Sequence, residues 1–191
     1  MNLKLIAAVA VVLQTAALGA FAGGDKEHAK HEMDKAAMMP MDSQTVVQKA
    51  AVSNMAEIRL GQLALQKSQD PEVRQFAERM VKDHTASLAK LKTAAAEDNV
   101  TVPTALDAEH QKKEQELTAL SGAAFDEAYG EQMEKAHHKT VALLENAQKS
   151  DKVSASLREY AASTLPTVKT HAKLAESLED STDDAKTAAD R

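Results

Sequence analysis

The chain has 191 residues, only 3% of them aromatic, with no tryptophan, no cysteine and a formal net charge of −6. This length suits one domain of ordinary size, and the scarcity of aromatic residues favours helices over sheets. Nucleic-acid binding is not expected, because phosphate neutralisation needs clustered Lys and Arg and the chain has no large basic block. The lack of cysteine excludes disulfides, thiolate chemistry and a lipoprotein anchor.

Residues 1–22 have the pattern of a signal peptide. Lys4 precedes an apolar run from Leu5 to Leu18, and Ala20-Phe21-Ala22 fits the A-x-A cleavage pattern, so the mature chain should begin at Gly23. The run is shorter than the ~20 residues that a membrane-spanning helix needs, and no second such run follows. We therefore expect an exported protein of the bacterial periplasm or envelope, with no transmembrane span after cleavage.

Residues 23–42 are expected to be disordered, because they lack an apolar face. They contain His28, His31 and Met33, followed by Met38-Met39-Pro40-Met41. Imidazole and thioether groups suit copper, so this segment could hold Cu(I) or Ag(I) loosely. The alternative is a solvated tether whose composition has no metal-binding role.

Apolar residues recur at spacings of three and four along most of the remaining chain, which predicts helices. The expected helices are residues 43–68, 71–96, 105–120, 123–149 and 153–178. Residues 98–104 form an extended crossover before the short, polar third helix. We expect a bundle domain over residues 43–179 and a disordered acidic tail over residues 180–191.

The two halves of this domain repeat one plan. Gln66-Lys67-Ser68 recurs as Gln148-Lys149-Ser150, and each copy precedes an R-[QE]-[FY]-A segment and then V-K-x-H. The second copy holds three extra residues around Pro166. The fold class predicted is therefore all-α, a four-helix bundle of two repeated helical hairpins with an extra short helix in the crossover.

Three histidines lie on the apolar stripes of these helices, and one glutamate lies beside such a stripe. They are His84, His137, His171 and Glu57. Glu57 lies 13 residues before Asp70 and His84 lies 14 after it, so both should be ~20 Å from the turn and face each other. His137 has a similar depth, and His171 appears one or two turns further along its helix. Together the four could hold one Zn, Fe, Mn or Cu ion.

A di-iron oxidase site is not expected. Glu134-x-x-His137 has the spacing used by carboxylate-bridged bundles, but Val81 and Val168 occupy the corresponding glutamate positions before the other two histidines. The alternative to a metal site is a hydrogen-bonded network of buried polar groups in a structural or stress-related envelope domain. No nucleophile motif, phosphate loop or dinucleotide fingerprint indicates an enzyme. The sequence identifies no protein partner, and it is compatible with a homo-oligomer.

Four segments resemble one known family: E-I-R-L-G-Q-L-A, F-A-x-x-M-V-x-D-H, F-D-x-x-Y-x-x-x-M-x-x-x-H and L-P-T-V-K-x-H-x-x-x-A. They resemble the bacterial exported family called domain of unknown function 4142, whose members often carry outer-membrane labels. The resemblance covers about residues 43–178. It implies a ferritin-like bundle with a Glu57, His84, His137 and His171 constellation and no established activity. Ala136 departs from the family pattern, where an Asp often precedes the histidine as Asp83 precedes His84.

Overall fold

The computed structural model describes residues 41–189, with side chains to residue 178. The predicted signal peptide and the segment with His28, His31 and Met33 lie outside the described residues. Within this range the chain forms five helices and no strand, which confirms the all-α prediction. They are α2 (Ser43–Lys67), α3 (Pro71–Glu97), α4 (Ala108–Thr118), α5 (Ala123–Lys149) and α6 (Ala155–Ala189).

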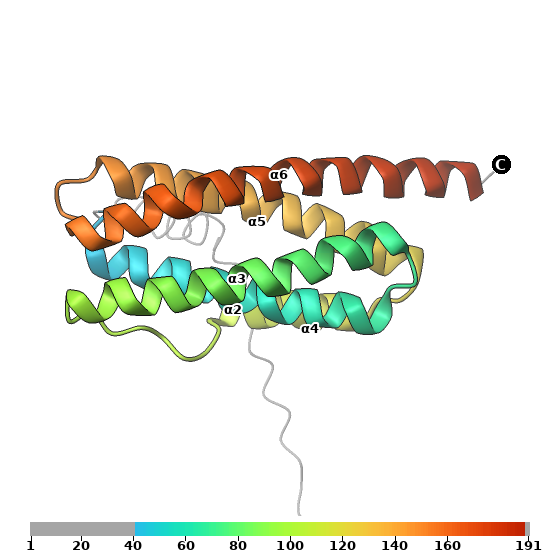
Figure 1. The fold of residues 1–191 in the computed structure, drawn as a ribbon. Helices are drawn as coiled ribbons and strands as arrows, with labels where there is room; N and C mark the ends of the chain where they lie inside the picture. Colours follow the sequence, from blue (N-terminus) through green and yellow to red (C-terminus); the bar gives the residue numbers. More distant parts are fainter. Residues whose placement is uncertain (1–40, 190–191) are drawn as a thin grey trace, which may run out of the picture. The chain divides into compact units, whose positions relative to one another are not determined.

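The four long helices form a bundle of two hairpins, α2/α3 and α5/α6 (Figure 1). The hairpins pack side by side through α3 against α6 and α2 against α5. Helices α2 and α6 begin at the end of the bundle where α3 and α5 finish (Figure 1). The short α4 lies along α2 and α5, on the connection between the hairpins. No helix within residues 41–189 has the length and apolar character that a membrane crossing requires.

The repeated sequence motifs close the two hairpin turns. Asp70 caps α3 by accepting hydrogen bonds from two backbone N–H groups of its first turn, and Pro71 is the first helical residue. Arg74 donates to the carbonyl oxygens of Leu65 and Ser68 at the end of α2, at 2.6 and 3.1 Å. Arg158 does the same in the second hairpin, donating to the carbonyl of Ser150 at 3.4 Å. The arginine of the repeated R-[QE]-[FY]-A segment therefore satisfies carbonyls that a helix end leaves open.

Buried apolar side chains gather in two clusters, one at each end of the bundle. The first includes Val47 of α2, Leu91 of α3, Leu144 of α5 and Leu157 of α6. The second, at the opposite end, includes Leu60, Met80, Phe125 and Ala175. Between the clusters lies a layer of buried polar residues: Asn54, Glu57, His84, His137, Thr164 and His171. The candidate site therefore lies at mid-height, with apolar packing above and below it.

Two helix boundaries differ from the sequence prediction by three residues or more, and the others agree within two residues. The short crossover helix begins at Ala108 instead of 105, because the side chain of Asp107 caps it by accepting from the N–H of His110 at 2.9 Å. The last helix continues to Ala189, so residues 180–189 are helical and the predicted disordered tail is wrong over that range. This stretch contains no glycine or proline to end the helix.

Candidate metal centre

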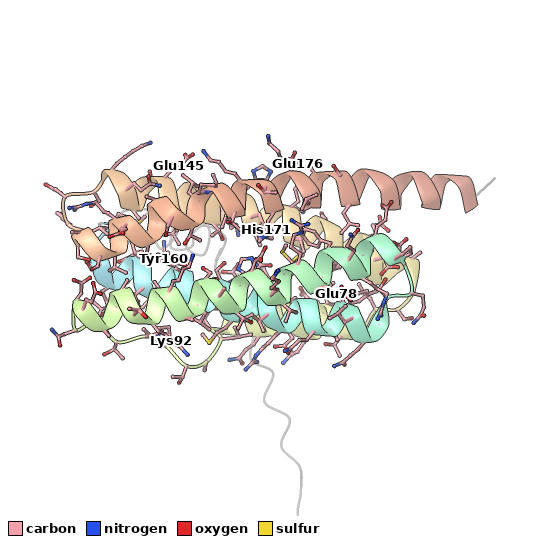
Figure 2. The ribbon with its side chains drawn as sticks, viewed as in Figure 1. Glu78, Lys92, Glu145, Tyr160, His171 and Glu176 are labelled. Atoms are coloured by element: carbon pink, nitrogen blue, oxygen red, sulfur yellow. The ribbon has the colours of Figure 1, made fainter. Side chains whose placement is uncertain are left out.

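Three histidine side chains from three helices meet in the polar layer. His84 of α3, His137 of α5 and His171 of α6 are each at most 3% exposed. Their ring centroids are 5.6 Å apart for His84 and His137, 5.3 Å for His84 and His171, and 5.4 Å for His137 and His171. One nitrogen from each ring lies within 4.8 Å of the other two. Figure 2 shows His171 pointing from α6 into the space between the helices. We call these residues the histidine triad.

One ring nitrogen of each triad histidine forms a hydrogen bond that orients the ring. The pairs are His84 Nδ1 with Asn54 Oδ1 at 3.0 Å, His137 Nδ1 with the Met133 carbonyl at 2.7 Å, and His171 Nε2 with Asp83 Oδ2 at 2.9 Å. The Asn54 amide nitrogen donates to the Ala50 carbonyl at 2.7 Å, so its oxygen faces His84. All three partners are acceptors, and each ring therefore donates an N–H to its partner.

The tautomers that follow leave three lone pairs inside the triad. His84 Nε2, His137 Nε2 and His171 Nδ1 are buried and have no hydrogen-bond partner among the described residues. Burial lowers the pKa of all three imidazoles, to about 4 for His137 and well below the usual range for His84. For His171 the Asp83 carboxylate opposes this effect without reversing it. At neutral pH the rings are neutral, which is the form that binds a metal.

The geometry fits a three-histidine metal centre. With Zn–N distances of about 2.0–2.1 Å, two nitrogens of a tetrahedral site lie ~3.4 Å apart, so ring movements of about 1 Å or less suffice. The N–H groups that point away from the centre donate to an amide oxygen, a backbone carbonyl and a carboxylate, as metal-binding histidines usually do. Sequence reasoning did not identify these three acceptors. Asn54 did have a visible signal, since it stands at a core-facing position of an apolar stripe.

Glu57 lies in the same polar layer but outside the triad's group of ligand atoms. It is 2% exposed and lines a cavity between α2, α4 and α5. Burial raises the pKa of its carboxyl to about 8, while His110 on α4 lowers it slightly. Burial and the nearby Glu57 both raise the pKa of Tyr129 on α5. The residue of α2 that contacts the triad is Asn54, and a fourth-ligand role for Glu57 stays a prediction.

Glu134 is likewise outside the triad. It belongs to a second group, with His138 and Glu176, whose ligand atoms lie within 4.8 Å of one another. His138 Nε2 is 3.6 Å from the Glu134 carboxylate and 3.2 Å from that of Glu176. His138 and Glu176 are exposed, and Figure 2 shows Glu176 on the outer face of α6. Glu134 therefore forms an i,i+4 contact with His138, the residue that follows His137 in the sequence.

Comparison with known proteins decides the family. The sequence pattern described as "Domain of unknown function (DUF4142)" matches residues 28–178. The chain belongs to this family. A search of curated proteins finds no match. The prediction made from the four sequence segments is confirmed, and the DUF4142 match covers the whole histidine triad.

Two solved structures have a similar fold. One is a crystal structure of a DUF305 fragment from Deinococcus radiodurans, with a TM-score of 0.63 and 14% identity, covering 74% of the DUF4142 chain and 99% of the fragment. The other is CopM in the Cu(II)-bound form, with a TM-score of 0.62 and 17% identity, covering 75% and 99%. Both are helical bundles of ferritin-like type, which confirms the predicted fold class.

Proposed function

We propose that this domain binds one divalent transition-metal ion, Zn, Fe, Mn or Cu, through His84, His137 and His171, in a protein exported to the periplasm or envelope. The proposal is carried by two observations on the triad. One nitrogen from each ring lies within 4.8 Å of the other two, and each ring has one buried nitrogen without a hydrogen-bond partner among the described residues. The rings are already oriented by Asn54 and Asp83 and by the Met133 carbonyl. An ion at this place would complete the coordination that the rings prepare.

A metal-free polar network is the competing function, and the tautomers argue against it. All three central nitrogens are acceptors, because the opposite nitrogen of each ring donates to a fixed acceptor. A water molecule at the centre has two protons and would leave one nitrogen unsatisfied. Protonation of a ring would supply the missing donor, but burial lowers the pKa of every ring. A cation satisfies all three lone pairs at once.

The likeness to CopM in its Cu(II)-bound form makes copper one of the first ions to test. Neutral imidazoles suit copper and zinc alike, so the ligand types do not distinguish between these two metals. Export is supported by the pattern of residues 1–22. Cell fractionation with N-terminal sequencing checks it, and a mature N-terminus at Gly23 is the expected result.

Metal titration of the mature protein tests the proposed centre. The metal-free chain is titrated with Zn²⁺, Cu²⁺, Fe²⁺ and Mn²⁺, and bound metal is measured by elemental analysis after gel filtration. We expect one ion per chain in the wild type and in His138→Ala, and none in His84→Ala. A combined His28→Ala, His31→Ala and Met33→Ala variant separates binding by the N-terminal segment from binding by the bundle. Stoichiometric binding that survives in His84→Ala would refute the triad.

A further inference from the structure

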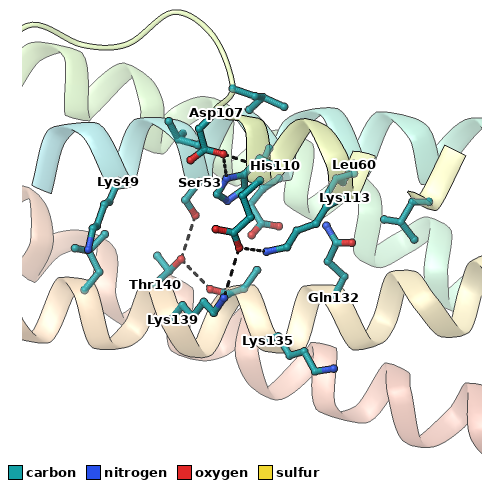
Figure 3. A pocket seen from close by; sticks show the side chains of 18 of the residues that line it. Lys49, Ser53, Leu60, Asp107, His110, Lys113, Gln132, Lys135, Lys139 and Thr140 are labelled. Carbon is teal, nitrogen blue, oxygen red and sulfur yellow. Dashed lines mark hydrogen bonds and ion pairs between the residues drawn. The ribbon is translucent and has the colours of Figure 1, made fainter. Parts of the chain in front are cut away.

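A cavity of about 1170 Å³ lies between α2, α4 and α5, on the side of the bundle that α4 covers (Figure 3). Its volume is slightly above the range of about 300–1,000 Å³ that is usual for small-molecule sites in proteins. Apolar side chains form much of its inner wall. They are Ala56, Leu60, Leu106, Leu117 and Leu143, all buried. The wall can therefore hold an apolar body.

Helix α4 packs Leu117 into an apolar cluster of the bundle and makes polar contacts at its edges. Arg59 of α2 pairs with Glu114 at 3.3 Å, and the Lys67 ammonium donates to the carbonyls of Thr118 and Leu120 at 2.7 and 2.8 Å. On the other side, Lys139 of α5 is 3.9 Å from Glu109. The space beneath α4 is thus bounded by exposed ion pairs, which cost little to rearrange.

One acidic side chain in the cavity wall lacks a basic partner. Glu57 forms no ion pair within the described part of the chain, and its Oε2 is buried without a hydrogen-bond partner. Three of the cavity's four lysines pair with acids: Lys113 contacts Glu109 at 2.6 Å, Lys139 is 3.9 Å from Glu109, and Lys135 pairs with Glu131. Lys49 forms no ion pair within the described part of the chain. A carboxyl group left unpaired in a buried wall is costly unless a ligand satisfies it.

Two hydroxyl groups beside Glu57 add acceptors to the same wall. Ser53 and Thr140 are 3.1 Å apart across α2 and α5, and Thr140 donates to the Ala136 carbonyl at 3.0 Å (Figure 3). Ser53 is therefore the donor in the pair, and its oxygen keeps lone pairs free to accept. Ser53 lies one helical turn before Glu57, so the two side chains share a face of α2.

We propose that this cavity binds a small primary amine with an apolar body, its ammonium group paired with the Glu57 carboxylate. An ammonium has three N–H donors and no acceptor, which matches the Glu57 carboxylate with the Ser53 hydroxyl oxygen one helical turn away on the same face of α2. A carboxylate ligand would instead bring a second acid to Glu57, in a wall where three of the four lysines already have acid partners. The amine site does not depend on the triad and goes beyond the proposed metal binding.

Calorimetry with three ligands of one chain length tests the site. Octylamine, 1-octanol and octanoate share the apolar body and differ in charge. We expect wild-type mature protein to bind octylamine at least ~10-fold more tightly than 1-octanol, because a hydrogen bond between two charged groups is stronger than one that involves a neutral hydroxyl. Glu57→Gln should keep the alcohol affinity and lose the preference for the amine. Glu131→Gln, which removes an exposed acid of the same cavity, should behave as the wild type.

Proton release provides a second readout. The raised pKa of Glu57 means that the empty site holds a proton at pH 7, and pairing with an ammonium expels it. The titratable groups that interact with Glu57 are His110 on α4 and Tyr129 on α5. Calorimetry at pH 7 in buffers of different ionisation enthalpy should show about one proton released per octylamine in the wild type and none in Glu57→Gln. Equal amine affinity in both proteins, tighter binding of octanoate, or no preference over 1-octanol would overturn the proposal.

Discussion

The histidine triad and Glu57 lie in the same polar layer, and both have buried atoms without hydrogen-bond partners. They differ in how they are supported. Each triad ring is fixed from behind by an acceptor, whereas the Glu57 carboxyl has no such partner and faces a cavity. The triad rings are therefore already oriented, and their close nitrogens could hold one small ion. Glu57 is positioned to adapt to a larger and more variable ligand.

Protonation also has opposite effects on buried charge in the two regions. A proton on Glu57 removes a buried charge, and burial accordingly raises its pKa to about 8. A proton on a triad ring creates a buried charge beside two other rings, and burial lowers the pKa of each. At neutral pH a proton can neutralise the acid, whereas the triad rings stay neutral and could hold a metal ion. Variants at each region should separate these behaviours.

The largest expected effect is on the pH dependence of stability in Glu57→Gln. The folded-state pKa of Glu57 is about 8 and its ordinary value is 4.5, so the folded state holds more protons between these values. The stability that this proton uptake contributes to the folded state is present in full below pH 4.5. It is lost as pH rises to 8, and the free energy of unfolding falls by up to about 1.4 kcal/mol per pH unit. Glu57→Gln removes this loss. Its free energy of unfolding should therefore exceed that of the wild type by several kcal/mol at pH 9.

Urea unfolding of metal-free protein from pH 5 to pH 9 measures this difference. The depressed histidine pKa values act in the opposite direction, since their contribution is present above pH 6.5 and is lost as pH falls through the lowered values. Both proteins share that loss, so it cancels in the comparison. Parallel stability curves for wild type and Glu57→Gln would show that Glu57 is not buried as a neutral acid.

The sequence predicted the members of the triad better than their geometry. His84 and His137 stand at apolar-stripe positions, so helical periodicity alone places them inside. His171 seemed one or two turns too far along its helix when counted from Asp151. The helix begins only at Ala155, which puts His171 16 residues into α6 against 13 for His84 in α3. A count from the turn cannot detect that delayed start.

The same count did not identify the side chain of α2 that hydrogen-bonds to His84. Equal depth favoured Glu57, yet Asn54, one turn earlier, makes the contact at 3.0 Å. One turn is about 5.4 Å along the axis, which is within the uncertainty of counting across a turn of unknown shape. The acceptor behind His137 is a backbone carbonyl, and side-chain patterns carry no information about it. Periodicity thus predicts burial, while contacts between helices require the packing itself.

A smaller effect, on metal affinity, is expected from a change at Asp83, which hydrogen-bonds to His171. Asp83→Asn keeps an acceptor at that place but removes the negative charge that makes the ring a stronger ligand. We expect metal affinity to fall ~10–100-fold with one ion per chain still bound at saturation. Competition with a chelator of known affinity measures the change. Glu78→Gln, an exposed acid of α3 that Figure 2 shows near the surface, serves as the control and should leave the affinity unchanged.

The smallest effect is expected at the exposed group of Glu134, His138 and Glu176. It uses the same two helices as His137 and His171, and its ligand atoms are equally close together. Solvent, however, screens its charges, and no acceptor orients its histidine from behind. Glu176→Gln should therefore change the free energy of unfolding by less than ~0.5 kcal/mol and leave metal stoichiometry at one. A fall in stoichiometry would move the metal to this surface group and leave the triad's three lone pairs without an assigned partner.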